Sequence, residues 1–168
     1  NPNGNGTGVS SNDTIYTTFT VCDPLNGTYT INPAGSGATN FTSFASAIST
    51  MSCGGVSGPV VFNVAAGTYN EQISIPVITG ASATNTITIQ SATLNAADVT
   101  LSFAATGANN YVLNLNGCDY VTFNKMTISN SNTGCCNNNV ILIGNGSDYN
   151  TFRSCSVYSP YTTNGYLV

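Results

Sequence analysis

Hydrophobic and polar residues alternate in short runs along most of this chain of 168 residues. An alternation with a period of two is typical of a β-strand with one buried face. It predicts a strand over residues 14–22, a turn over 23–27 and a second short strand over 28–32. Similar runs continue almost to the end of the chain, so the sequence predicts an all-β protein.

One pattern of eight residues occurs twice in the second half of the chain. Residues 116–123 and 145–152 both read Asn-Gly-x-Asp-Tyr-x-Thr-Phe, at an offset of 29 (145 − 116 = 29). Asn, Gly and Asp favour turns, whereas the second half of the pattern alternates as a strand does. A turn and strand that recur at a fixed interval are typical of a solenoid, in which each coil buries its apolar face against the next.

The runs predict a right-handed parallel β-helix of about four coils, with its strands in three rows. The first row contains residues 60–64, 86–90, 112–115 and 140–143, and the second contains 73–77, 99–103, 120–123 and 149–152. The third row includes residues 126–128 and 155–157. Parallel strands need no crossover helices in this fold, because the coil itself connects them.

Residues 41–51 follow a helical period instead. The apolar residues of this stretch fall on one helical stripe: Phe41, Phe44, Ala45, Ile48 and Met51. We expect Thr39 or Asn40 to cap the start of the helix and the Gly54-Gly55 pair to end it. An amphipathic helix at this place is expected to cover the open end of the β-helix core.

The predicted organisation is a single domain with three parts. Residues 1–13 form a flexible leader, 14–57 the N-terminal strands and the capping helix, and 58–168 the parallel β-helix. The N-terminus has no basic region or apolar core, so it resembles a mature end after signal removal or a fragment boundary. We expect the protein to be extracellular.

Charged residues make up only 5% of the chain, and the net charge is −4. Lys125 and Arg153 are the only cationic side chains. Nucleic acids and anionic membranes are bound through basic patches, so neither is an expected partner. No apolar run approaches the length of a membrane span, so membrane insertion is not expected either.

The chain has six cysteines and no histidine. An even number of cysteines without histidine favours disulfides over a zinc site. The expected pairs are Cys22 with Cys53, and Cys118 and Cys155 with the adjacent Cys135 and Cys136. Buried free thiols are the alternative. Five Asn-x-Ser/Thr sequons are candidate glycosylation sites, although several are expected by chance in a chain so rich in asparagine: Asn5, Asn12, Asn26, Asn40 and Asn145.

Three consecutive segments resemble the start of pectin-lyase-like β-helices. Residues 41–48 match the capping helix, residues 58–64 the first strand, and residues 67–75 a corner of the form Gly-x-Tyr-x-Glu. The Thr-, Asn- and Gly-rich style is similar to β-helix regions of secreted Bacteroidetes surface proteins, which the type IX pathway exports. The resemblance covers about residues 28–158. Asp13-Thr14-Ile15 also resembles the O-glycosylation motif of that phylum, which makes Thr14 a candidate site.

The resemblance to enzymes of this fold implies what a catalytic site would contain. Pectate lyases use clustered aspartates with a basic residue, polygalacturonases several aspartates with His, Arg and Lys, and pectin methylesterases two aspartates with Gln and Arg. Glu71 matches the corner motif, but that glutamate is not a catalytic group in those families. The chain has no histidine, no adjacent carboxylates and two separate cations. These absences lead to the expectation of a non-catalytic protein.

Asp119 and Asp148 occupy equivalent positions in the repeated turn. Three interpretations are open for the pair: capping of backbone amides, a calcium site together with Asn116 and Asn145, and general acid–base catalysis. No cofactor or metal is expected, and calcium is the alternative that this pattern suggests.

Two further patterns concern exposed side chains. The following aromatic residues are expected to form core or surface ladders, with a sugar-binding platform as the alternative: Tyr111, Tyr120, Phe123, Tyr149 and Phe152. An ice-binding surface is considered for Thr86, Thr88, Thr122, Thr127 and Thr151. Lys125, Asn150 and Arg153 interrupt that threonine pattern.

The functional expectation is a structural subunit of a surface fibre or filament, or an adhesin module, that assembles head to tail. The partner would be another copy of the chain or the rest of a longer parent chain. The residues expected at the joints lie in the first strand and at the C-terminus: Ile15, Phe19, Val21, Tyr166, Leu167 and Val168. The alternative is a carbohydrate-binding or polysaccharide-active β-helix module, with glycans as partners.

Overall fold

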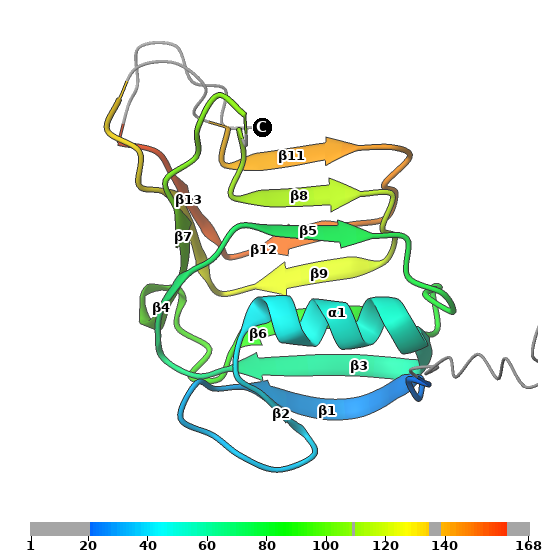
Figure 1. Cartoon of the computed structure of the whole chain (residues 1–168). Helices are drawn as coiled ribbons and strands as arrows, with labels where there is room; N and C mark the ends of the chain where they lie inside the picture. Colours follow the sequence, from blue (N-terminus) through cyan, green and yellow to red (C-terminus); the bar gives the residue numbers. More distant parts are fainter. Residues whose placement is uncertain (1–20, 109, 135–138, 161–168) are drawn as a thin grey trace, which may run out of the picture.

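The computed structural model describes residues 21–108, 110–134 and 139–160. Its strands form three sheets around one core (Figure 1). Sheet A contains, in spatial order, β12 (Thr151–Arg153), β9 (Val121–Asn124), β6 (Ile87–Ser91), β3 (Val56–Val64), β1 (Leu25–Ile31) and β2 (Asn40–Phe41). Sheet B contains β13 (Ser156–Tyr158), β10 (Thr127–Asn130), β7 (Val99–Phe103) and β4 (Gly67–Asn70). Sheet C contains β11 (Ile141–Gly144), β8 (Leu113–Asn116) and β5 (Ile73–Pro76).

The chain passes through the sheets in the same order in every coil. The successive coils are β3–β4–β5, β6–β7–β8 and β9–β10–β11, followed by β12 and β13. Neighbouring strands within the three sheets pair in parallel. This arrangement is a parallel β-helix, and the predicted fold class and number of coils are confirmed.

The predicted composition of the rows is wrong for several strands. Strands β8 and β11 correspond to residues 112–115 and 140–143 of the prediction. Strand β8 pairs with β5, and β11 pairs with β8, so both lie in sheet C instead of joining β3 and β6. Strand β7 likewise belongs with β10 in sheet B rather than with β5 or β9. The error arises because the coils differ in length. Register partners in neighbouring coils lie 27, 34 and 40 residues apart at different places, so a constant interval misplaces strands.

The N-terminal part also differs from the prediction. Strand β1 begins at Leu25, which the sequence had placed in a turn, and it pairs with β3. Most of the strand predicted over 14–22 lies outside the described residues, as does the predicted leader, and Val21 and Cys22 form no strand. Val21 is the one proposed joint residue that the structure describes, and its side chain is exposed.

Helix α1 (Phe44–Gly54) begins later than predicted. Its N-cap is Ser43, which forms a capping box with Ser46, rather than Thr39 or Asn40. Phe41 lies in β2, where its ring contacts Phe62. Gly55 ends the helix with a positive φ of 73°, as the glycine pair predicted. The helix packs against β5 and β1 (Figure 1), and its apolar face joins the same core as the coils.

The core consists of side chains stacked from coil to coil. Phe62 of β3, Ile89 of β6 and Phe123 of β9 are register partners and are almost completely buried. Phe152 of β12 follows, and its ring stacks on Phe123 at a centroid distance of 5.3 Å. Each step of such a ladder removes apolar surface from water, about 25 cal/mol per Å². The ladder therefore holds successive coils together.

The disulfide between Cys22 and Cys53 confirms one predicted pair. It links the start of the described chain to the last turn of α1, and closing a loop of this size contributes about 3–4 kcal/mol in the chain-entropy account. The other predicted pairs are not found, because Cys118 and Cys155 are free thiols. Cys118 points into the core and is fully buried. The two expected partners, Cys135 and Cys136, lie outside the described residues.

The Gly-x-Tyr-x-Glu corner anchors α1 to the first coil. The hydroxyl group of Tyr69 donates to the carbonyl oxygens of Ile31 and Ala65. The carboxylate of Glu71 accepts hydrogen bonds from the backbone N–H groups of Phe44 and Ala45, at 3.1 and 2.9 Å. These are free donors at the helix N-terminus, where the helix dipole also favours a negative charge. Glu71 is therefore a capping residue.

We expect Glu71→Ala to destabilise the protein by about 1–2 kcal/mol, because it removes two hydrogen bonds to a charged acceptor. Urea unfolding monitored by circular dichroism would measure the loss. Glu71→Gln keeps an acceptor without the charge and should lose less. A Glu71→Ala protein as stable as the parent would contradict the capping role.

Candidate functional site

The repeated turn places matching residues on top of one another in coils three and four. Gly117 and Gly146 have positive φ values of 86° and 76°, and Tyr120 and Tyr149 have φ values of 58° and 57°. The strained conformation of the two tyrosines is rare for a residue with a Cβ atom. Its recurrence 29 residues later shows that the sequence repeat encodes a repeated corner, which sends the chain from sheet C into sheet A.

Side chains of one turn bind the backbone or side chain of the other. Oδ1 of Asp119 accepts a hydrogen bond from the N–H of Asp148 at 2.7 Å. Nδ2 of Asn145 donates to Oδ1 of Asn116, and the hydroxyl oxygen of Ser147 accepts from the N–H of Gly117. Asp119 thus caps the following turn, as the capping interpretation predicted.

The exposure of the fourth coil alternates from Tyr149 onward. Tyr149, Thr151 and Arg153 are exposed, whereas Asn150 and Phe152 between them are partly buried. The third coil repeats this order, with Val121 and Phe123 fully buried. Successive side chains of a strand point to opposite faces. The outer surface of sheet A here therefore carries six side chains, named the polar face below: Tyr120, Thr122, Asn124, Tyr149, Thr151 and Arg153.

A tyrosine stack forms one end of the polar face. The rings of Tyr120 and Tyr149 are nearly parallel, with an interplanar angle of 5° and a centroid distance of 4.8 Å. The side chain of Tyr149 is 73% exposed. Of the predicted aromatic ladder, Phe123 and Phe152 form a core pair and the tyrosines a surface pair. An exposed aromatic ring next to hydrogen-bonding groups offers both an apolar face and polar contacts to a ligand.

Two columns of hydroxyl and amide side chains extend from the polar face onto the first two coils. Thr88, Thr122 and Thr151 are register partners and form one column. The neighbouring column contains Asn63, Gln90, Asn124 and Arg153. Its amides are linked, since Asn124 donates to Gln90 at 3.0 Å and Gln90 donates to Asn63 at 2.9 Å. The buried Oδ1 of Asn124 has no hydrogen-bond partner among the described residues.

The amide column was not found from the sequence. The sequence does contain a pattern that could have indicated this column, because each of its residues lies two positions after a Thr or Val of a predicted strand. It could not be used, since the separations of 27 and 34 residues along the column differ from the regular interval that was assumed.

Other predicted site residues are distributed over the fold. No cluster of three or more His, Cys, Asp or Glu that could hold a metal exists among the described residues, and the calcium site at Asp119, Asp148, Asn116 and Asn145 stays a prediction. Asn26 is exposed in β1. The side-chain amides of Asn40 and Asn145, in contrast, donate hydrogen bonds within the fold. The remaining glycosylation candidates lie outside the described residues: Thr14, Asn5 and Asn12.

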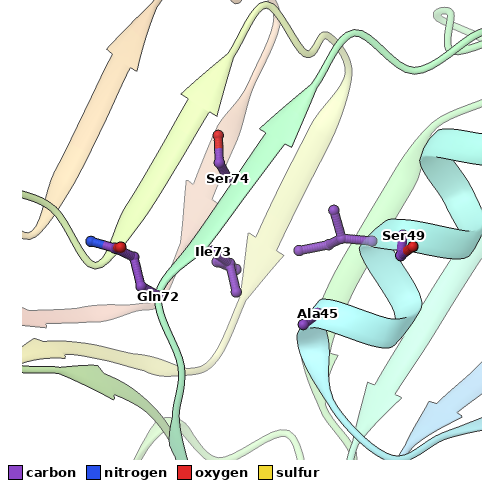
Figure 2. Close-up of a pocket in the computed structure, with 6 residues that line it drawn as sticks. Ala45, Ser49, Gln72, Ile73 and Ser74 are labelled. Carbon is purple, nitrogen blue, oxygen red and sulfur yellow. The ribbon is translucent and has the colours of Figure 1, made fainter. Parts of the chain in front are cut away.

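A shallow pocket of about 220 Å³ lies elsewhere, between α1 and β5 (Figure 2). Ala45, Ile48 and Ser49 line it from the helix, and Gln72, Ile73 and Ser74 line it from the first coil. None of these side chains titrates, so the pocket offers no acid or base for catalysis. The pocket is therefore a less suitable reaction site than the polar face with its two nearby aspartates.

The two free thiols differ in their surroundings. Burial in the core raises the pKa of Cys118 to about 11, and the hydrogen bond with Ser147 offsets only part of this effect. Cys155 is partly exposed, and its Sγ lies 3.4 Å from the carbonyl oxygen of Phe123.

We expect Cys118 to resist alkylation at neutral pH until the protein unfolds, because the thiolate is the reacting species and the thiol is buried. Mass-spectrometric peptide mapping after iodoacetamide treatment would locate the label, with Cys155 as the internal comparison. Labelling of Cys118 at the same rate as Cys155 in the folded protein would contradict this assignment.

The raised pKa of Cys118 also predicts a pH dependence of stability. Between about pH 9 and pH 11 the thiol is ionised in the unfolded chain but still protonated in the folded protein, so the free energy of unfolding should fall as the pH rises through this range.

Comparison with known proteins adds information about the fold. No protein-family model matches the sequence, and no curated protein matches it significantly. Solved structures of pectin methylesterases do match. One is a D178A mutant in complex with a hexasaccharide, with a TM-score of 0.59 and 15% identity over 77% of this chain and 42% of that one.

Two further matches are also pectin methylesterases. The enzyme from Erwinia chrysanthemi has a TM-score of 0.59 and 13% identity over 79% of this chain and 43% of that one. The enzyme from Aspergillus niger has a TM-score of 0.57 and 16% identity over 82% of this chain and 45% of that one. The chain is a right-handed parallel β-helix of the pectin-lyase-like type. It spans less than half the length of each of these matches.

These matches correct the functional expectation. The chain was expected to be a non-catalytic subunit of a fibre, filament or adhesin. The solved structures that match it are instead pectin methylesterases, which are enzymes that act on a polysaccharide. They favour the alternative of a carbohydrate-active module. The finer resemblance to Bacteroidetes surface proteins finds no support among them. No helix in the described part of the chain is long and apolar enough to cross a bilayer.

Proposed function

We propose that this chain is a carbohydrate-active β-helix module that binds a polysaccharide on the polar face of coils three and four. The observation that carries the proposal is the stack of Tyr120 and Tyr149, with Tyr149 73% exposed, in line with hydroxyl, amide and guanidinium groups. Three of the matching structures are pectin methylesterases, and one contains a hexasaccharide. These matches support the choice of ligand class.

The polar face has the groups that a saccharide requires. The faces of sugar rings carry C–H groups that pack on an aromatic ring, as other apolar surfaces do. The hydroxyl groups around the ring need both donors and acceptors, which the hydroxyl groups of Thr122 and Thr151 supply. Arg153 adds five donors and a positive charge at the end of the face opposite the tyrosines.

Coil stacking determines how a polysaccharide would lie. Neighbouring parallel strands are about 4.8 Å apart, so one coil step is roughly as long as one sugar residue. Along the strand from Tyr149 to Arg153, every second side chain lies on the polar face, and each of these side chains carries a different chemical group. A chain of several sugars can therefore contact both coils at once.

The surroundings of the two turn carboxylates suggest where chemistry would take place. Asp148 is exposed next to Tyr149, whereas Asp119 accepts a hydrogen bond from the backbone N–H of Asp148. A carboxylate at the edge of a sugar-binding surface can act as a general acid or base on a bound ester or glycoside. Asp148 is accordingly the residue to vary in a turnover assay.

The location that we propose is extracellular. A disulfide between Cys22 and Cys53 is typical of oxidising compartments, and polysaccharides are encountered outside the cell.

We expect Tyr149→Ala to weaken polysaccharide binding by about fivefold, because an aromatic contact contributes on the order of 1 kcal/mol. Affinity electrophoresis in gels containing methyl-esterified pectin, pectate, xylan or β-glucan would identify the ligand and measure the change. Tyr149→Phe keeps the ring and should bind almost as the parent does. Tyr158→Ala removes an exposed tyrosine of sheet B and serves as the matched control.

The same preparations test turnover. Methanol release from methyl-esterified pectin and release of reducing ends would be measured for the parent and for Asp148→Asn. Binding that depends on Tyr149 supports the proposed face, and turnover lost in Asp148→Asn assigns the chemistry to it. Binding to none of the polysaccharides, or equal loss in Tyr149→Ala and Tyr158→Ala, would contradict the proposed face.

A further inference from the structure

The outer face of sheet A continues from the polar face onto the first two coils. In β6 the outward side chains are Thr88 and Gln90, which alternate with buried residues. In β3 the outward side chains include Pro59, Val61 and Asn63, which alternate with buried residues in the same way. Successive side chains of a strand point to opposite faces, so these side chains lie on the same outer surface as the polar face.

The chemistry of this surface repeats from coil to coil. A hydroxyl group recurs on three successive coils in the register partners Thr88, Thr122 and Thr151. Beside this column, an amide recurs on three successive coils in Asn63, Gln90 and Asn124. Along any one strand, in contrast, each outward side chain differs from the next. The repeating direction of the surface is therefore the axis of the β-helix.

A linear polysaccharide repeats in the same manner. Its sugar residues present the same hydroxyl groups and ring faces at regular intervals, and the strand spacing of about 4.8 Å is roughly the length of one sugar residue. A polymer that lies across the strands, along the axis of the β-helix, can make the same kind of contact on each coil. A polymer that lies along a strand meets a different side chain at every step.

The second coil has groups that suit such contacts. Thr88 is partly exposed, and its hydroxyl group can donate and accept. Gln90 donates to Asn63 and accepts from Asn124, which leaves the second N–H of its amide for a ligand. Because these two hydrogen bonds already order the Gln90 side chain, less freedom is lost when a ligand binds.

The surroundings of the second coil are complete within the described residues. Strand β6 lies between β3 and β9 in sheet A, and both neighbours are described. On the β3 side, the exposed ring of Pro59 and the partly exposed Val61 add apolar surface. The C–H groups of a sugar ring can pack on such a surface.

We infer that the polysaccharide lies along the axis of the β-helix over sheet A, and that coils two and one form further sugar-binding subsites next to the polar face. The inference rests on the proposed function, because it takes the polar face as part of the same site. Thr88 and Gln90 supply hydrogen bonds on coil two, and Pro59 and Val61 supply apolar contacts on coil one. The ligand is a linear, hydroxyl-rich polymer with a uniform repeat.

Oligosaccharides of increasing length test the direction of the ligand. They would be prepared from the polysaccharide that binds the parent protein in the gel screen, and isothermal titration calorimetry would give the affinity for each length. Coils one to four are separated by three steps of about 4.8 Å, or roughly 14 Å in total. We expect the affinity to rise with each residue from the disaccharide to the tetrasaccharide. An affinity that stops rising at the disaccharide would overturn the inference.

Thr88→Val tests the subsite on coil two. It removes the hydroxyl group but keeps the shape of a β-branched side chain. It should weaken binding of the tetrasaccharide by about fivefold, the effect of one neutral hydrogen bond, and leave binding of the disaccharide unchanged. Tyr149→Ala should weaken binding of both. Thr100→Val makes the same change at a partly exposed position of β7 in sheet B and is the matched control. Circular dichroism would verify that the variants fold.

Ser156→Ala tests the other direction, because β13 follows β12 along the same coil. A loss of tetrasaccharide binding in Ser156→Ala but not in Thr88→Val would place the polymer along the strand and overturn the inference. Binding that depends on Tyr149 would then still support the proposed function. Equal losses in Thr88→Val and Thr100→Val would contradict the inference as well. A parent protein that binds none of the polysaccharides would overturn both the inference and the proposed function.

Discussion

The in-register parallel pairing of successive coils is the constraint on which the rest of the structure depends. Each strand satisfies its backbone hydrogen bonds with the coil before and after it, so equivalent positions must stack directly. Inside, this stacking gives the Phe62–Ile89–Phe123–Phe152 ladder. Outside, it gives columns of threonines and amides. Like charges stacked in this way would repel one another, and a charged fraction of only 5% is consistent with that limit.

Asparagine side chains link neighbouring coils both along the sheets and at the corners. Amide side chains can donate to one coil and accept from another, as Gln90 does on sheet A, where it donates to Asn63 and accepts from Asn124. In the corner between sheets C and A, Asn150 accepts from the N–H of Val121 and donates to the carbonyl oxygen of Cys118. In the described part of the chain, the coils are thus joined both by core packing and by hydrogen bonds of neutral side-chain amides.

The polar face results from the same repetition. Two neighbouring coils present the same series of a tyrosine, a threonine and a longer polar residue. Their outer surface therefore has a regular pattern both along the strands and from one coil to the next. Such a surface suits an extended ligand with a repeating structure better than a compact small molecule. The matched pectin methylesterases share this architecture at 13–16% identity, so they establish the fold, and the face has to be judged from its own side chains.

The sequence by itself determined the fold class, the repeated corner and the capping helix, because these depend on local periodicity and turn chemistry. It did not determine which strands share a sheet, since loops of different length separate register partners by 27 to 40 residues. Tertiary structure alone decided that Glu71 caps α1 and that Gln90 and Asn124 form one column. Each of these features depends on contacts between neighbouring coils or with the cap, and no local pattern encodes such contacts.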